Sequence, residues 1–493
     1  MELFLLILSM ALPVAGGTFF IRWLLRADAE LSIFEAVTFG IGAGLGFTAF
    51  EMLLLGLLGL PFTVVTAGLP VAVFTALFFF LARTGLKARG LAMPGTKGQG
   101  LHGLRLYLTI IMVLWVAAKT GFVFYESLTR PVFSYDSFLN WAIAGKFFYY
   151  KAGLFLDASN EHFLGRGYRY FIGHPLHLSL LQTWIALVLG LFHEVYVKAP
   201  GPLYFAGVLG LLYYGVKREA GSYYALITVF FMAGVPIFTV HGQDAYADLP
   251  LCFFALSGTV ALWRFFKDDL LSYLVLGGIF LAMAMFVKNE GIFFALAGGA
   301  ALVLYLFTRK RSFIAPLAGF ILPFIIIAGP WMLFKYHHGI GSGHSGPSSG
   351  FQWFSSNPLD PDAVSSGMHW EVLGIAFREI FFTANYNLIF PLWIIASLIA
   401  LRTIISSRLK YLYVIILLVS SMFLFIYLTL EITAVTEETG IHRNTLTYLP
   451  LVYFAAALVI SNIWPDSRRA ATRGESPSSS PASLTGQVSD DIL

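Results

Sequence analysis

Long hydrophobic runs, separated by shorter polar stretches, dominate the pattern of this chain. Many runs are about 18 to 25 residues long, the length that an α-helix needs to cross roughly 30 Å of hydrocarbon. We therefore predict an all-α, polytopic membrane protein with about thirteen spanning helices. The predicted spans are 2–21, 33–59, 62–82, 104–124, 199–216, 221–240, 248–266, 270–287, 291–308, 313–334, 387–403, 411–430 and 446–463.

The composition excludes several classes of protein. Of the residues, 58% are hydrophobic and 12% are charged, whereas about a quarter are charged in a soluble domain. The net charge of +4 is spread over many loops without a basic stripe, so nucleic acid is not an expected partner. The single cysteine, Cys252, excludes a disulfide framework and a cysteine-based metal site.

The charges also predict an orientation and a domain organisation. On this map 20 of the 31 lysines and arginines lie on one side, which the positive-inside rule makes cytoplasmic. Residues 1–103 would form extra N-terminal helices with a basic cytoplasmic loop, and 104–463 the core. The Ser-rich stretch 464–493 has little to bury and is predicted to be a disordered cytoplasmic tail.

The apolar stretch 174–198 breaks the alternation of sides. Treating it as a span would place Lys217 and Arg218 outside, so we predict a re-entrant or interfacial helix that begins near His174. A fourteenth span remains the alternative.

Charged residues gather on the side predicted to be extracytoplasmic, in the outer loops 125–198, 335–386 and 431–445. In a membrane protein, such a face is the default location of a functional site. Asp136 follows the exit of a span by about a dozen residues and is a candidate general base. Its alternative role is to cap the helix that starts at Ser137.

The turn HGQDAYADLPL places Asp244 and Asp248 four residues apart, beside His241. Two carboxylates at this spacing can share one face of a helix and hold a cation or an acceptor. Helix capping is the alternative for Asp248, because Pro250 follows closely.

Lys288 and Glu290 interrupt an apolar stretch, where an unpaired charge costs a few kcal/mol. Lys288 is therefore expected either to face a phosphate or to pair with Glu290 or Asp248. In the last outer loop, His442 and Arg443 are candidates for binding a phosphoryl group. For Arg443, snorkelling to lipid headgroups is the alternative.

The Gly- and Ser-rich loop 335–386 fits either a mobile lid or a plain connector. Its histidines, His337, His338, His344 and His369, lack the spacing of a metal site. The metal ligands of this chain, if there are any, are unknown from the sequence.

Five motifs follow one another along the chain: an early Asp in an outer loop, a helix opening with His-Pro-Leu, the ADLPL turn, a lysine turn and a late arginine. This order resembles that of the C-type (GT-C) integral membrane glycosyltransferases. Members include the protein O-mannosyltransferases and the aminoarabinose transferase of lipid A. The resemblance covers roughly 104–463. It implies that Asp136 and Asp248 are the catalytic acidic residues, and that Lys288 and Arg443 contact the donor phosphate.

The resemblance further implies an inverting glycosyltransferase that takes a sugar from a polyprenyl-phosphate or polyprenyl-diphosphate donor. Short outer loops and the lack of a sequon-binding motif favour a lipid or glycan acceptor over protein. His174, His241, Asp244 and Glu290 are then candidate contacts for the acceptor or a cation. No cofactor is required, although the scheme accommodates a divalent cation.

The expected location is a bacterial inner membrane, with membrane lipids as partners and the site on the periplasmic or extracellular face. A lipid-substrate transporter or flippase, and an O-antigen ligase or polymerase, are the alternative functions. The sequence shows no internal repeat of the kind that is typical of transporters. The oligomeric state does not follow from the sequence.

Overall fold

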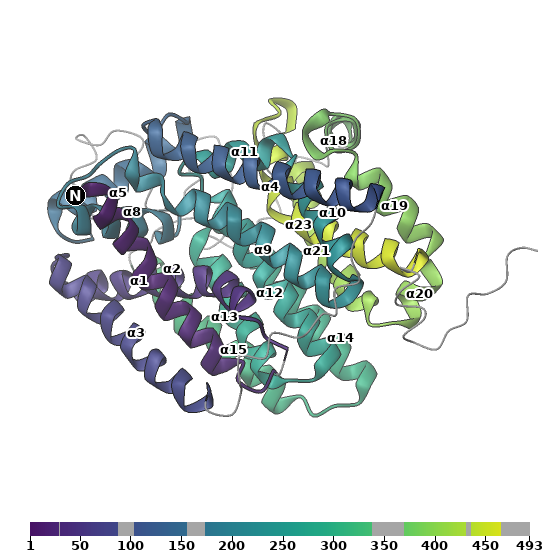
Figure 1. Ribbon diagram of the computed structural model, residues 1–493, viewed down its shortest axis with the longest axis horizontal. Helices are drawn as coiled ribbons and strands as arrows, with labels where there is room; N and C mark the ends of the chain where they lie inside the picture. The colour runs from purple at the N-terminus through teal and green to yellow at the C-terminus, as the bar shows by residue number, and fades with distance from the viewer. Residues whose placement is uncertain (29, 87–102, 155–172, 338–368, 430–434, 465–493) are drawn as a thin grey trace, which may run out of the picture.

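A computed structural model describes the chain except residues 29, 87–102, 155–172, 338–368, 430–434 and 465–493. The described residues form helices and no strand, which confirms the predicted all-α bundle (Figure 1). The predicted disordered tail and most of the predicted lid lie outside the described residues.

The first three helices form a group at one side of the bundle (Figure 1). They are α1 (Glu2–Leu24), α2 (Ile33–Leu57) and α3 (Val64–Leu86), and α1 packs against both of the others. Gly44 lets α1 and α2 approach closely, because a Cβ there would lie 1.9 Å from the Pro13 carbonyl oxygen. Small residues at such crossings are a common device in membrane helix packing.

In the rest of the bundle, the apolar window of α12 (Asp248–Asp268) is completely buried inside the protein. Its neighbours include α9, α13 and α23. The other helices of this region are α4 (Leu104–Thr129), α9 (Pro200–Ala220), α10 (Ser222–Ala233), α11 (Pro236–Gln243), α13 (Leu271–Val287), α14 (Gly291–Arg309), α15 (Ile314–Ile327), α16 (Gly329–His337), α19 (Ile389–Ile399), α20 (Leu401–Ser406), α21 (Leu409–Thr429) and α23 (Thr439–Ile463).

The thirteen predicted spans differ in length and hydropathy in the structure. Helices occupy all thirteen predicted positions, but in the described residues only 8 are long and apolar enough to cross a membrane alone, or up to 10 with two bent pairs. The pair α10 and α11 bends by 71°, at the extended Val235 before Pro236, and the pair α15 and α16 bends by 48°. Pro cannot donate to the helix ladder, which explains the first break. α13 has 17 residues and α19 has 11, fewer than the roughly 20 of a typical span. Glycine, tyrosine and proline lower the hydropathy of α9.

The segment whose placement was ambiguous forms the short helix α8 (His177–Leu189). At 13 residues it is too short to cross a bilayer by itself, and nearly all of its side chains are buried. It packs against α1, α2 and α5 (Ile143–Lys151). Burial in protein fits a re-entrant helix and does not fit a helix that lies along the membrane surface.

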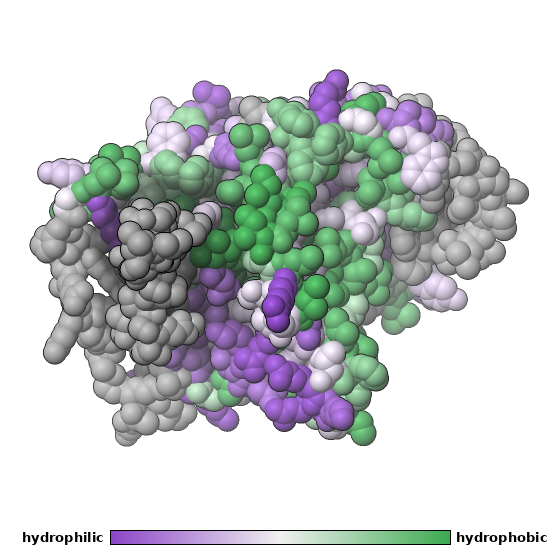
Figure 2. Space-filling model, turned by 90° about the vertical axis from the view of Figure 1, so that its right-hand side faces the viewer, coloured by the Kyte–Doolittle hydropathy of each residue, from purple (hydrophilic) through white to green (hydrophobic). Residues whose placement is uncertain are grey.

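A broad band of hydrophobic residues crosses the face seen in Figure 2, with hydrophilic residues below it and a few above it. Many large apolar side chains of the outer helices are exposed, including Leu114 of α4 and Ile325 of α15. An exposed apolar belt between polar rims is what a bilayer covers. The protein is therefore an integral membrane protein.

Candidate active site

Four of the predicted site residues meet where several helix ends come together. Asp136 directly precedes the short π-helix η1 (Ser137–Ala142), Asp248 begins α12, Lys288 follows α13, and Arg443 lies in the first turns of α23. Charged side chains from four separate segments thus form one cluster, which we call the Arg443 cluster.

Arg443 connects two carboxylates that are far apart in the sequence. Its Nη2 and Nε atoms donate to Asp248 Oδ2 at 2.9 and 3.3 Å, and its Nη1 forms an ion pair with Asp136. Asp136, the N-cap residue of η1, makes no side-chain capping hydrogen bond, and Asp248 lies in the first turn of α12, after the N-cap residue Ala247. Pairing with the two carboxylates directs Arg443 into the protein and not to lipid headgroups.

Lys288 supplies the second positive charge. Its Nζ lies 2.9 Å from Asp248 Oδ1 and 3.0 Å from Glu290 Oε1, so both pairings proposed from the sequence are present. Burial alone would lower the pKa of Lys288, but the carboxylates of Asp248 and Glu290 raise it above its ordinary value. Lys288 is therefore a fixed cation next to Arg443.

Asp244 holds the loop that presents Asp136. Asp244 Oδ2 accepts hydrogen bonds from the Ser134 amide at 2.8 Å and from the Ser134 hydroxyl, while Oδ1 accepts from the Ala245 amide at 2.8 Å. Its side chain is completely buried. Asp244 thus holds Ser134, which lies two residues before Asp136.

Two aromatic rings line the cluster. The Arg443 guanidinium lies over the Tyr246 ring at 5.4 Å, within the range of a cation–π contact, and the His241 ring lies 4.2 Å from Tyr246. Burial raises the pKa of the Tyr246 hydroxyl. His241 Nε2 is 3.8 Å from Asp248 Oδ2, too far for a hydrogen bond.

The predicted turn 288–290 also anchors the segment that leads into α8. Asn289 Nδ2 and Lys335 Nζ both donate to the Gly173 carbonyl, at 3.2 and 2.9 Å. The adjacent His174 is buried and its ring lies 5.4 Å from that of Trp141. His174 therefore lies in a segment that is held by Asn289 of the lysine turn and by Lys335 of α16.

His442, the other residue predicted to bind the phosphate, points to a different group of residues. Its Nε2 faces Glu379 at 3.3 Å and its Nδ1 faces the Tyr386 hydroxyl at 2.8 Å. Successive residues of a helix project about 100° apart, which explains why His442 and Arg443 have separate partners.

Comparison with known families gives a match to the middle of the chain. The model of the dolichyl-phosphate-mannose-protein mannosyltransferase family matches residues 173–333. The resemblance to the C-type membrane glycosyltransferases is confirmed. No curated protein and no solved structure matches the chain.

The match supports a C-type glycosyltransferase that uses a lipid-linked sugar donor. The matched interval contains Asp244, Asp248 and Lys288, whereas Asp136 and Arg443 lie outside it. In the folded chain these two residues lie next to the matched interval, because Arg443 contacts both Asp136 and Asp248.

Sequence reasoning missed Tyr246, Ser134 and Glu379. Tyr246 lies inside the DAYADLPL turn, and an aromatic residue between two aspartates in an outer turn is the signal that would have identified it. Ser134 and Glu379 carry no such signal, since their partners Asp244 and His442 are distant in the sequence.

Proposed function

We propose that this protein transfers a sugar from a polyprenyl-phosphate or polyprenyl-diphosphate donor to a lipid or glycan acceptor at the extracytoplasmic face of the membrane. Asp136 is the general base, and Arg443 and Lys288 bind the donor phosphate. Asp248 holds the two cations in place.

One observation supports these roles above the others: Arg443 bridges a buried acid and an accessible one. The side chains of Arg443 and Asp136 are 27% and 24% exposed, whereas that of Asp248 is 0% exposed. A phosphate that enters from the exposed side meets the Arg443 guanidinium next to Asp136, and a guanidinium binds two phosphate oxygens well.

In this mechanism the donor phosphate replaces Asp136 as the partner of Arg443. The released Asp136 carboxylate accepts the proton of the acceptor hydroxyl as that oxygen attacks the anomeric carbon. The bond between this carbon and the phosphate oxygen breaks, and the polyprenyl phosphate leaves with the electron pair. Arg443 and Lys288 stabilise the charge that develops on the leaving oxygen.

The assignment of a lipid or glycan acceptor rests on the short outer connections, which provide no soluble domain for binding a protein chain. The extracytoplasmic placement rests on the distribution of lysine and arginine. No cofactor is required, and a divalent cation at the phosphate is compatible with the scheme.

The test is sugar transfer by the purified protein from a panel of labelled polyprenyl-phosphate donors to membrane lipids. We expect Asp136→Asn to lower the rate by about 10²- to 10⁴-fold, the usual contribution of a general base. Asp269→Asn is a matched control, because Asp269 also pairs with an arginine, Arg311, away from the cluster. Absence of transfer from every donor, together with movement of lipid-linked sugars across liposomes, would favour a flippase instead.

A further inference from the structure

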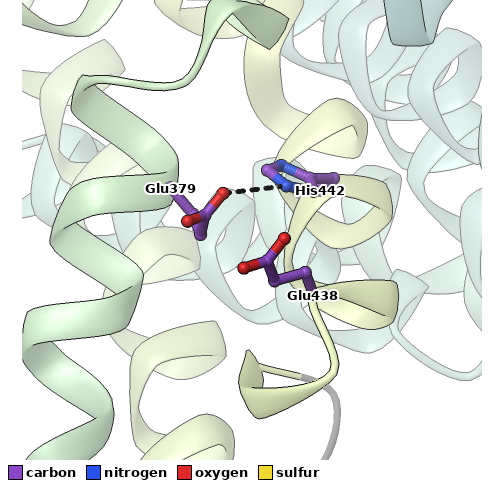
Figure 3. Close-up of side chains that lie close together, drawn as sticks. All are labelled: Glu379, Glu438 and His442. Carbon is purple, nitrogen blue, oxygen red and sulfur yellow. Dashed lines mark ion pairs between the residues drawn. The ribbon is translucent and has the colours of Figure 1, made fainter.

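Beside the Arg443 cluster, three side chains with metal-binding atoms converge from two helices. They are Glu379 of α18 (Glu371–Phe381), Glu438 just before α23, and His442 of α23 (Figure 3). One ligand atom from each lies within 4.8 Å of the other two. The mechanism above uses none of the three.

The distances suit a small divalent ion. Zn²⁺ binds histidine nitrogen and carboxylate oxygen at about 2.0 to 2.2 Å, so two such ligands in a tetrahedral site lie roughly 3.4 Å apart. The distance from His442 Nε2 to Glu379 Oε2 is 3.3 Å. An ion thus fits between these two atoms with little movement of either residue.

The surrounding groups orient the ligands as they do around metals. Histidine ligands usually hydrogen-bond through the second ring nitrogen, and His442 Nδ1 lies 2.8 Å from the Tyr386 hydroxyl. Arg378 Nε binds Glu379 Oε1 at 2.7 Å, which leaves Oε2 directed at His442. Arg378 Nη2 also binds Glu438 Oε1 at 2.9 Å.

The charges of the cluster favour a further cation. Glu379 is almost completely buried, with a side chain 3% exposed, and Glu438 adds a second carboxylate. Arg378 contributes one positive charge to the two negative ones. Because Arg378 is shared by both carboxylates, the cluster keeps a net negative charge. The nitrogen and oxygen donors here suit Zn²⁺ or a similar transition metal more than Mg²⁺ or Ca²⁺.

We propose that Glu379, Glu438 and His442 bind one divalent transition-metal ion, with water or substrate completing its coordination. The ion joins α18 to the first turn of α23. Because Arg443 follows His442 directly, the ion is placed to fix the position of Arg443. The binding of the metal does not depend on the proposed transferase activity, whereas this positioning role rests on it.

The binding test is titration of the chelator-treated, purified protein with Zn²⁺, and with Co²⁺ for its visible absorption. We expect one equivalent per chain and the Co²⁺ spectrum of a tetrahedral site. His442→Ala and Glu438→Gln should each weaken binding at least tenfold. Since Glu438 is half exposed, its variant should fold even if the His442 variant does not.

His369 and Glu371 provide the matched control, since they form a more exposed His–Glu pair at 2.9 Å that belongs to no three-ligand group in the described residues. Their variants, His369→Ala and Glu371→Gln, should bind the metal unchanged. The proposal is overturned if wild type binds less than one equivalent, or if His442→Ala and Glu438→Gln bind as wild type does. In that case the residues form only an ion-pair network around Arg378.

Failure of the positioning role is separable from failure of metal binding. If the ion positions Arg443, its removal should raise KM for the donor at least fivefold. Equal transfer kinetics with and without the bound ion would reject the positioning role but not the proposed metal site.

Discussion

Two arginines in this protein each join two carboxylates, but the surroundings of the two clusters differ. Arg218 of α9 binds Asp28, in the connection after α1, and Glu35 of α2, both at 2.7 Å. The three side chains are 9%, 9% and 4% exposed. Arg443 binds Asp136 and Asp248, and here both Arg443 and Asp136 are about a quarter exposed.

Arg218, Asp28 and Glu35 form what we call the Arg218 cluster. Within it, Asp28 also accepts a hydrogen bond from the Tyr273 hydroxyl. Burial works to raise the pKa of Asp28, but this hydrogen bond and the charge of Arg218 outweigh it, and the pKa lies below its ordinary value. No exposed side remains for a ligand among these residues. The Arg218 cluster therefore joins the N-terminal helices to the core, whereas the Arg443 cluster keeps one accessible partner that a substrate can replace.

The strongest test of this difference is Arg443→Gln. We expect loss of transfer by about 10³-fold, the scale on which preorganised charge stabilisation is lost. The loss of folded protein should be smaller than in Arg218→Gln, because Lys288 remains a partner of the buried Asp248. Arg443→Lys should recover only part of the activity, because lysine lacks the bidentate geometry. If Arg443→Gln transferred sugar at the normal rate, the arginine would have only a structural role.

Arg218→Gln should lower the stability of the protein much more than its transfer activity. Removing one partner from a buried ion pair costs about 3 to 5 kcal/mol, so the apparent melting temperature in detergent should fall clearly. The protein that remains folded should retain transfer activity within a few-fold. A variant with normal stability but no transfer would show that the Arg218 cluster also takes part in function.

Asp244→Ala should have a smaller effect, because Asp244 acts on Asp136 through Ser134. A shift of a catalytic group by about 1 Å can cost roughly 10²-fold in rate, and we expect a loss of 10- to 100-fold. Asp268→Ala, at the other end of α12, is the matched control. Equal rates for Asp244→Ala and wild type would mean that the 133–134 loop keeps its position without this carboxylate.

The helices and the candidate charges could be predicted because hydropathy and charge are local properties of the sequence. Apart from the two pairings of Lys288, the contacts between these charges could not be predicted. Asp136 and Arg443 are 307 residues apart, and Arg218 and Asp28 are 190 apart, so only packing shows that they meet.

The predictions failed where local hydropathy does not determine tertiary structure. A hydrophobic run does not reveal the 71° bend before Pro236. Glu379 was overlooked because α18 has the amphipathic pattern of a surface helix, although α23 buries this one carboxylate. The position of α8 depends on its packing against α1 and α2, which the sequence of α8 does not contain.

The smallest effect should come from a third ion pair, between Lys146 and Glu194. Their atoms are 3.0 Å apart, as close as in the buried clusters, but both side chains are nearly half exposed. Solvent and salt screen such a pair, so Lys146→Met should change stability by less than about 0.5 kcal/mol. The melting temperature should shift little in low or high salt, and transfer should be unchanged. A loss comparable to that of Arg218→Gln would show that distance between the charges, and not burial, determines how much these pairs contribute.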